Sequence, residues 1–190
     1  MAANAKFRRS WPSSPIAKAA LALAVLSAGP LGPGSAARAQ VRVNLPEVRA
    51  SVESRGSGET VRRLQAAGQW DVVLDGIANG EVAWIALVPR LAQGTDAGQS
   101  LGVALAKALP RAPAAVLHAL DAKDGPALGP SRVCGAPFAE PTPEFLAAYR
   151  PRALAAVQSV RDARLRNIRD ACLAVLRKGE DANAPDSSRR

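Results

Sequence analysis

The fold is decided by residues 69–92, which read QWDVVLDGIANGEVAWIALVPRLA. The first half of this stretch repeats apolar residues at positions i, i+3, i+4 and i+7, namely Trp70, Val73, Leu74 and Ile77. This spacing places one apolar face on an α-helix of 3.6 residues per turn. It predicts a helix over 69–78 with one buried face.

The second half of the stretch is apolar almost throughout, at Val82, Trp84, Ile85, Leu87, Val88 and Leu91. Side chains this closely spaced cannot all lie on one face, so we expect a helix over 81–92 that is covered on most sides. This helix is the expected centre of the core.

Shorter apolar stripes outside this stretch predict further helices, each bounded by Gly, Pro or a capping residue. They begin near Asn44, Glu59, Asp96, Pro113 and Thr142. Strand-like alternation is missing outside residues 41–45. The predicted class is all-α, either a compact bundle or a short stack of helical hairpins of the HEAT type, although no repeat of fixed period is found.

Residues 1–39 have the order of a secretory signal peptide. Positive charge comes first, and the apolar run AALALAVLSA follows at 19–28, about half of the roughly 20 residues that a membrane-spanning helix needs. Small residues then predict cleavage between Ala39 and Gln40. An arginine pair at positions 8 and 9 leaves the general and the twin-arginine export routes both open. We expect a soluble bacterial protein of the periplasm or the medium.

Cleavage would change the charge of the protein. The chain has 25 basic and 16 acidic residues, a net charge of +9. Five basic and no acidic residues lie in 1–39, so the exported part has 20 basic and 16 acidic residues, a net charge of +4. This mild excess, with few aromatic residues, argues against nucleic acid as a partner.

Cys134 and Cys172 are the only cysteines, and an oxidising compartment predicts a disulfide between them. This bond would staple a long loop over 122–141, rich in Gly and Pro, to the last helix. The expected organisation is therefore a signal peptide (1–39), an N-terminal arm (40–58), a single helical domain (59–178) and a disordered tail (179–190).

The last predicted helix, which Pro151 opens and which continues to Lys178, carries one misplaced charge. Arg161 takes the place of an apolar residue in a seven-residue repeat formed by Leu154, Ile168 and Val175, and Arg164 flanks the same stripe. Three explanations are open for Arg161: a buried ion pair with an earlier helix, a side chain that extends to the edge of the stripe, or a groove that binds an acidic partner.

Few residues offer catalytic chemistry. His118 is the only histidine, with Asp121 three residues on, and no Gly-x-Ser-x-Gly elbow accompanies it. Asp71 and Asp75 share one helix face, but a solvated flank is the simpler interpretation. The loop 94–98 precedes a helix, where Asp96 and Gln99 indicate a capping box rather than an anion site. We expect no catalytic residue, no metal and no cofactor.

The sequence thus favours a non-catalytic protein-binding module of the cell envelope, such as an inhibitor, an immunity-type protein or an adaptor. The expected partner is another envelope or secreted protein, and Arg161 and Arg164 are the candidate contact residues. One alternative is a binder of polyanions or membrane surfaces, because residues 150–178 hold eight basic and two acidic residues. An envelope hydrolase is a weaker alternative.

Overall fold

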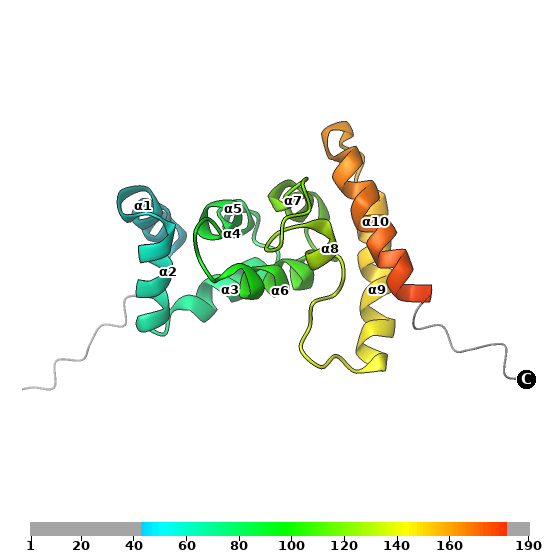
Figure 1. Ribbon diagram of the computed structural model, residues 1–190, viewed down its shortest axis with the longest axis horizontal. Helices are drawn as coiled ribbons and strands as arrows, with labels where there is room; N and C mark the ends of the chain where they lie inside the picture. Colours follow the sequence, from blue (N-terminus) through cyan, green and yellow to red (C-terminus); the bar gives the residue numbers. More distant parts are fainter. Residues whose placement is uncertain (1–42, 182–190) are drawn as a thin grey trace, which may run out of the picture. The chain divides into compact units, whose positions relative to one another are not determined.

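The computed structural model describes residues 43–181 (Figure 1). The helices are α1 (Leu45–Arg55), α2 (Ser57–Ala66), α3 (Trp70–Ala78), α4 (Val82–Ile85), α5 (Val88–Leu91), α6 (Gly98–Ala108), α7 (Pro113–Ala119), α8 (Pro130–Val133), α9 (Pro143–Ser159) and α10 (Arg166–Asp181), with the 3-10 turn η1 (Ala163–Leu165) before α10. No residue in the range 43–181 lies in a β-strand, so the all-α prediction is confirmed. The predicted signal peptide, its cleavage site at Ala39 and Gln40, and residues 182–190 of the predicted tail lie outside the described residues.

Helix α1 packs against α2. The Asn44 side chain caps α1 as expected, because its Oδ1 accepts the Glu47 N–H at 3.0 Å. Most of the range expected as an N-terminal arm is helix α1, which contributes the buried side chains of Val48 and Val52 to the core. Helix α2 ends in a left-handed glycine, Gly68, and the next N–H donates back to the Leu64 carbonyl at 2.8 Å. Gly68 therefore closes this helix, as the sequence predicts.

Helix α3 packs against α6, which lies beside it (Figure 1). Trp70, Val73 and Ile77 are buried as predicted, and Leu74 is half-buried. Gly76 lets α4 approach α3 closely, since a Cβ built on this residue would lie 2.6 Å from Trp84 Cδ1. A glycine is required at this crossing because the neighbouring atoms belong to a buried indole ring.

The predicted single helix over 81–92 is wrong, because the chain forms two short helices, α4 and α5, with a turn at residues 86–87. Pro89 explains the break. It has no N–H to donate to the Ile85 carbonyl, and its ring would clash with that carbonyl in a continuous helix. The expected burial is confirmed, since Ile85, Val88 and Leu91 are fully buried.

The C-terminal part is a pair of long helices, α9 and α10, which pack side by side (Figure 1). The expected boundary at Pro151 is wrong, because α9 runs through this proline. The expected continuous helix to Lys178 is also wrong. The chain leaves the helix at Val160, which is extended, and the Asp162 Oδ1 accepts the Arg164 N–H at 2.9 Å to begin η1.

The long loop between α7 and α9 contains one helical turn, α8, and is otherwise irregular, as predicted. The Asp124 carboxylate holds this turn by accepting the backbone N–H of Ser131 at 2.8 Å, in addition to its hydroxyl. Cys134 follows α8 and forms a disulfide with Cys172 of α10, with the Cα atoms 5.4 Å apart. The loop is therefore stapled to the last helix at the predicted pair.

Candidate functional site

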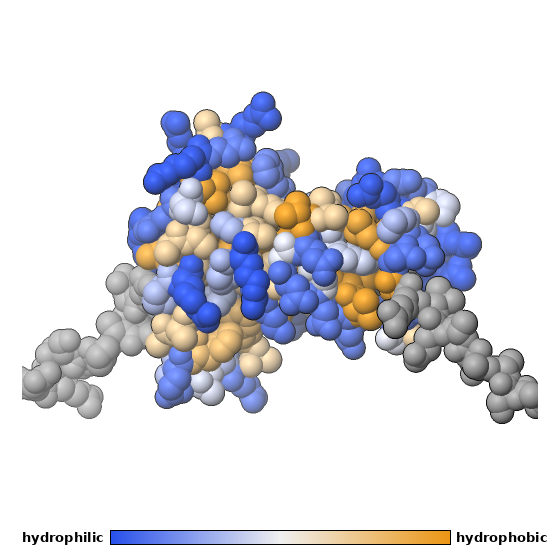
Figure 2. Space-filling model, turned by 180° about the vertical axis from the view of Figure 1, so that it is seen from behind, coloured by the Kyte–Doolittle hydropathy of each residue, from blue (hydrophilic) through white to orange (hydrophobic). Residues whose placement is uncertain are grey.

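A surface groove of about 810 Å³ lies between α3, the end of α6, the loop after Cys134 and one face of α9. We call it the basic groove. Its lining consists of Asp75, Ala78, Asn79, Lys107, Pro110, Arg111, Phe138, Phe145, Tyr149, Arg152, Ala155 and Ala156. The groove therefore combines apolar and charged surface. On the face of the molecule drawn in Figure 2, long hydrophilic side chains likewise lie directly beside apolar surface.

Three aromatic rings form the apolar part of the groove. The rings of Phe145 and Tyr149 are nearly parallel, 6.1 Å apart with an interplanar angle of 5°. Phe138 meets both of them edge-on, at 5.0 Å from Phe145 and 4.9 Å from Tyr149. Tyr149 is only 3% exposed, whereas Phe145 is 44% exposed. The cluster thus has a buried base and one ring open to solvent.

The buried ring connects two helices. The Tyr149 hydroxyl donates a hydrogen bond of 2.8 Å to the Ala106 carbonyl, which ties α9 to α6. Burial raises the pKa of Tyr149 far above its ordinary value of 10.0, and the nearby Arg150 opposes this only in part. The phenol is therefore neutral at physiological pH and acts as a hydrogen-bond donor.

Three cations line the groove: Lys107 on α6, Arg111 just after α6, and Arg152 on α9. The hydrogen bonds of the two arginines go to backbone carbonyls. Arg111 Nη1 donates to Ala78 O at 3.4 Å and to Lys107 O at 3.2 Å, and Arg152 Nε donates to Ala148 O at 2.8 Å. None of the salt bridges found among residues 43–181 includes these cations or Asp75. The groove thus holds three cations and one carboxylate.

Arg161 and Arg164 do not line this groove, and both are exposed in the connector between α9 and α10. The explanation of Arg161 by a buried ion pair is therefore wrong. The apolar repeat that made Arg161 anomalous assumed one continuous helix, and the chain departs from that helix at Val160. A position in an exposed connector requires no compensation for its charge.

His118 lies on the surface, with Nε2 3.7 Å from Asp162 Oδ2 in the connector. The expected neighbour Asp121 is occupied elsewhere, since its carboxylate accepts the backbone N–H groups of Lys123 at 2.9 Å and Gly125 at 3.2 Å. The pair that the structure brings together is therefore His118 and Asp162, and Asp121 shapes the loop.

Two further candidate sites from the sequence are the carboxylates of α3 and the loop that precedes α6. Asp71 is exposed on α3, whereas Asp75 lines the basic groove. The predicted capping box at Asp96 is wrong, because α6 begins at Gly98 and has no side-chain cap. Thr95 organises this turn instead, since its Oγ1 accepts the Ala97 N–H at 3.3 Å and donates to Leu91 O at 2.9 Å.

Within residues 43–181, no three His, Cys, Asp or Glu side chains cluster in a way that could hold a metal ion. In the same range, no single helix has the length and apolarity to cross a membrane. One pair, α3 with the segment 82–91, meets both criteria together but is bent by 115°. Comparisons of the chain with family models, curated proteins and solved structures find no match.

The sequence did not group Arg152 with Phe145 and Tyr149, because a new helix was expected to begin at Pro151. With α9 continuous, Phe145, Tyr149 and Arg152 follow the spacing i, i+4, i+7 and share one face. Phe145 on this face is 44% exposed at the groove. A face that carries two aromatic residues and an arginine is a signal that could have indicated a binding surface.

Proposed function

We propose that this protein is a non-catalytic protein-binding module of the cell envelope, and that its binding surface is the basic groove. The observation that carries the proposal is Phe145, an aromatic side chain left 44% exposed in a groove lined by three cations. Aromatic residues and arginine are enriched at protein interfaces and supply most of their binding energy. Large apolar side chains on a surface patch commonly mark such interfaces.

The rigid base of the groove supports the same proposal. Tyr149 is fixed by burial and by its bond to Ala106, and the disulfide at Cys134 anchors the loop that carries Phe138. A preorganised surface binds a partner with less loss of conformational entropy. An exported adaptor or inhibitor needs such a surface and no reactive group.

Site-specific photo-crosslinking tests this proposal in cells that produce the full chain. A benzophenone amino acid replaces Phe145 in one variant and Val82, which is 61% exposed on α4, in the matched control. We expect a discrete protein adduct from position 145 that is absent from position 82. Equal labelling at the two positions, or no adduct at 145, would contradict the proposal.

A second candidate function is binding to polyanions or to an anionic membrane surface. The observation that favours it is a cluster of exposed arginines, with Arg161 and Arg164 in the connector and Arg166 at the start of α10. Clustered surface arginines attract anionic lipids, and salt weakens this attraction.

Co-sedimentation with phosphatidylglycerol vesicles separates the two functions. If the connector binds the surface, the double variant R161E/R164E loses binding at low ionic strength, and R177E/K178E on α10 serves as the charge-matched control. Equal binding by the two variants, or binding that resists added salt, would exclude this candidate. Phe145→Ala should not change the result.

A further inference from the structure

We infer that the basic groove recognises a short acidic segment of its partner protein, one that presents an apolar or aromatic side chain beside its carboxylates. This inference rests on the proposed function and adds the chemistry of the partner. It follows from three features of the groove. These are an aromatic ring exposed to solvent, cations that form no salt bridge, and an arginine that bonds carbonyl oxygens at two helix C-termini.

The open ring defines the anchor. Phe145 stacks parallel to Tyr149 and meets the edge of Phe138, so two neighbours already fix its orientation. Its remaining surface is exposed, and an apolar side chain placed on it would be removed from water on a rigid aromatic base. An aromatic anchor gains additional ring–ring attraction in this arrangement.

The unpaired cations define the charge. Lys107 and Arg152 come from the two helices that the Tyr149–Ala106 hydrogen bond joins, so they flank the aromatic cluster from α6 and from α9. Neither forms a salt bridge with a described residue, and Asp75 is the only carboxylate in the lining. Complementary charge requires an occupant with more carboxylates than ammonium or guanidinium groups.

Arg111 removes the main electrostatic obstacle to such an occupant. The C-terminal ends of α3 and α6 both lie at the groove, and the negative ends of two helix dipoles would repel a carboxylate. The Arg111 guanidinium bonds the carbonyl oxygens of Ala78 and Lys107, one in the last turn of each helix. It thereby offsets both negative ends.

The distribution of the cations favours a polypeptide over a compact anion. They lie on α6, on the turn after α6 and on α9, and the groove of about 810 Å³ leaves Phe145 open to solvent. An extended segment with more than one carboxylate can pair with more of these cations than a single small anion. A peptide side chain also supplies the anchor within the same ligand.

The test is selection from a random peptide library displayed on phage, with the immobilised full chain as bait. The bait is used as wild type, as Phe145→Ala, as K107E/R152E, and as R177E/K178E, whose charge change on α10 matches that of K107E/R152E. We expect wild type and R177E/K178E to enrich peptides in which Asp or Glu adjoins Trp, Phe or Leu. Synthetic copies of these peptides should bind K107E/R152E about tenfold more weakly than wild type.

The results distinguish failure of the acidic-segment inference from failure of the protein-binding groove. Peptides that depend on Phe145 but are neutral or basic would overturn the acidic segment and leave the protein-binding groove in place. Peptides whose enrichment is indifferent to Phe145→Ala, or no enriched peptide, would overturn both. Equal loss of affinity in K107E/R152E and R177E/K178E would mean that the net charge of the protein alone causes the loss. This result would also overturn the inference.

Discussion

The Tyr149 hydroxyl donates a 2.8 Å hydrogen bond to the Ala106 carbonyl, an oxygen that α6 itself cannot satisfy in the usual way. In a regular helix this oxygen accepts the N–H four residues later, and that residue is Pro110, which has none. The Leu109 N–H reaches the same oxygen at 3.3 Å. Helix α9 thus supplies the donor that α6 lacks, at the base of the basic groove.

Replacement of this tyrosine by phenylalanine should destabilise the protein with little change in shape. The Tyr149→Phe variant keeps the ring contacts with Phe138 and Phe145 and loses only the hydroxyl. Because the Ala106 carbonyl then has only the 3.3 Å contact, we expect the free energy of unfolding to fall by about 1–2 kcal/mol. Urea denaturation measures this change. Val82→Ala, at an exposed position, is the control, and equal stability of Tyr149→Phe and wild type would refute the explanation.

The same hydroxyl predicts a loss of stability at alkaline pH. In the unfolded chain the phenol ionises near its ordinary pKa of 10.0, whereas burial raises this pKa in the folded protein. The folded state then holds a proton that the unfolded state has lost. The contribution of the neutral phenol is therefore complete below about pH 10 and is lost as the pH rises above that value.

Tyr149 is the only tyrosine of the chain, so tyrosinate absorbance reports on this residue alone. We expect the ionisation to follow unfolding in an alkaline titration rather than to precede it. Between about pH 8 and about pH 11, wild type should lose more stability than Tyr149→Phe. A phenol that titrates reversibly near pH 10 in the folded protein would contradict the burial of Tyr149.

The crossing of α3 and α4 predicts a second sensitive position. An alanine at Gly76 would bring its Cβ to 2.6 Å from Trp84 Cδ1, so the indole or a helix must shift. We expect Gly76→Ala to cost about 1–3 kcal/mol of stability, although alanine is the better helix former. Gly58→Ala in α2 is the matched control, because the nearest atom is the flexible Arg62 Nη1 at 3.5 Å. Thermal melts in which both variants match wild type would contradict the close crossing.

Removal of the disulfide should weaken both the fold and the groove. The bond connects α10 to the start of the loop that carries Phe138. Cys134→Ser/Cys172→Ser should lower the free energy of unfolding by about 2–5 kcal/mol. Limited proteolysis should cut within 134–142 sooner than in wild type. Equal denaturation curves for this variant and oxidised wild type would contradict a stabilising role.

The helical elements could be predicted because their signals are local. The i, i+3, i+4, i+7 repeat at Trp70 defines the buried face of α3 without help from any other segment. The break after α9 was missed because residues 159–162 contain neither glycine nor proline. An extended Val160 and the capping carboxylate of Asp162 produce it, and both depend on how α10 packs back on α9.

The groove could not be predicted in the same way, because four separate segments contribute to it. Asp75, Lys107, Phe138 and Arg152 are adjacent only after α3, α6 and α9 have packed. Sequence spacing reveals a face of one helix, and it does not reveal which two faces meet. The interpretation of Arg161 failed for the related reason that a break in the helix changed which residues share a face.

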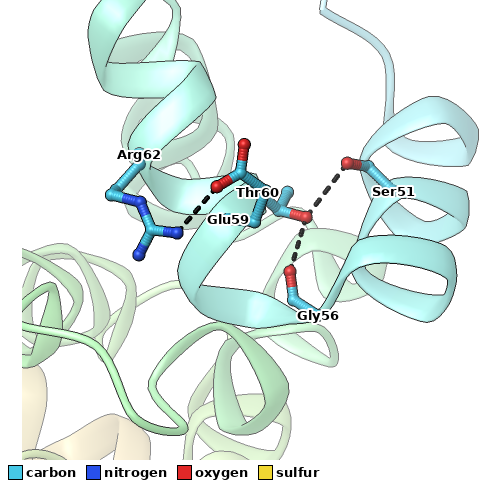
Figure 3. Close-up of polar contacts among 5 residues, drawn as sticks. All are labelled: Ser51, Gly56, Glu59, Thr60 and Arg62. Carbon is cyan, nitrogen blue, oxygen red and sulfur yellow. Dashed lines mark hydrogen bonds and ion pairs between the residues drawn. The ribbon is translucent and has the colours of Figure 1, made fainter.

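A further prediction concerns Thr60 at the junction of α1 and α2, a polar side chain that is only 2% exposed. Its hydroxyl donates to the Gly56 carbonyl at 2.8 Å and lies 3.0 Å from Ser51 Oγ (Figure 3). A threonine hydroxyl has one proton, so Ser51 must donate in the second bond. Thr60 thus links the two helices through one donated and one accepted hydrogen bond.

Thr60→Val keeps the shape of the side chain and removes both bonds, so we expect it to cost about 1–2 kcal/mol. Ser51→Ala should cost less, because Ser51 is half-exposed and Thr60 can still donate to Gly56. Thr60→Ser retains the hydroxyl and should recover part of the loss. Urea denaturation ranks the three variants by their free energy of unfolding. A Thr60→Val variant as stable as Thr60→Ser would mean that the methyl group, and not the hydroxyl, joins α1 to α2.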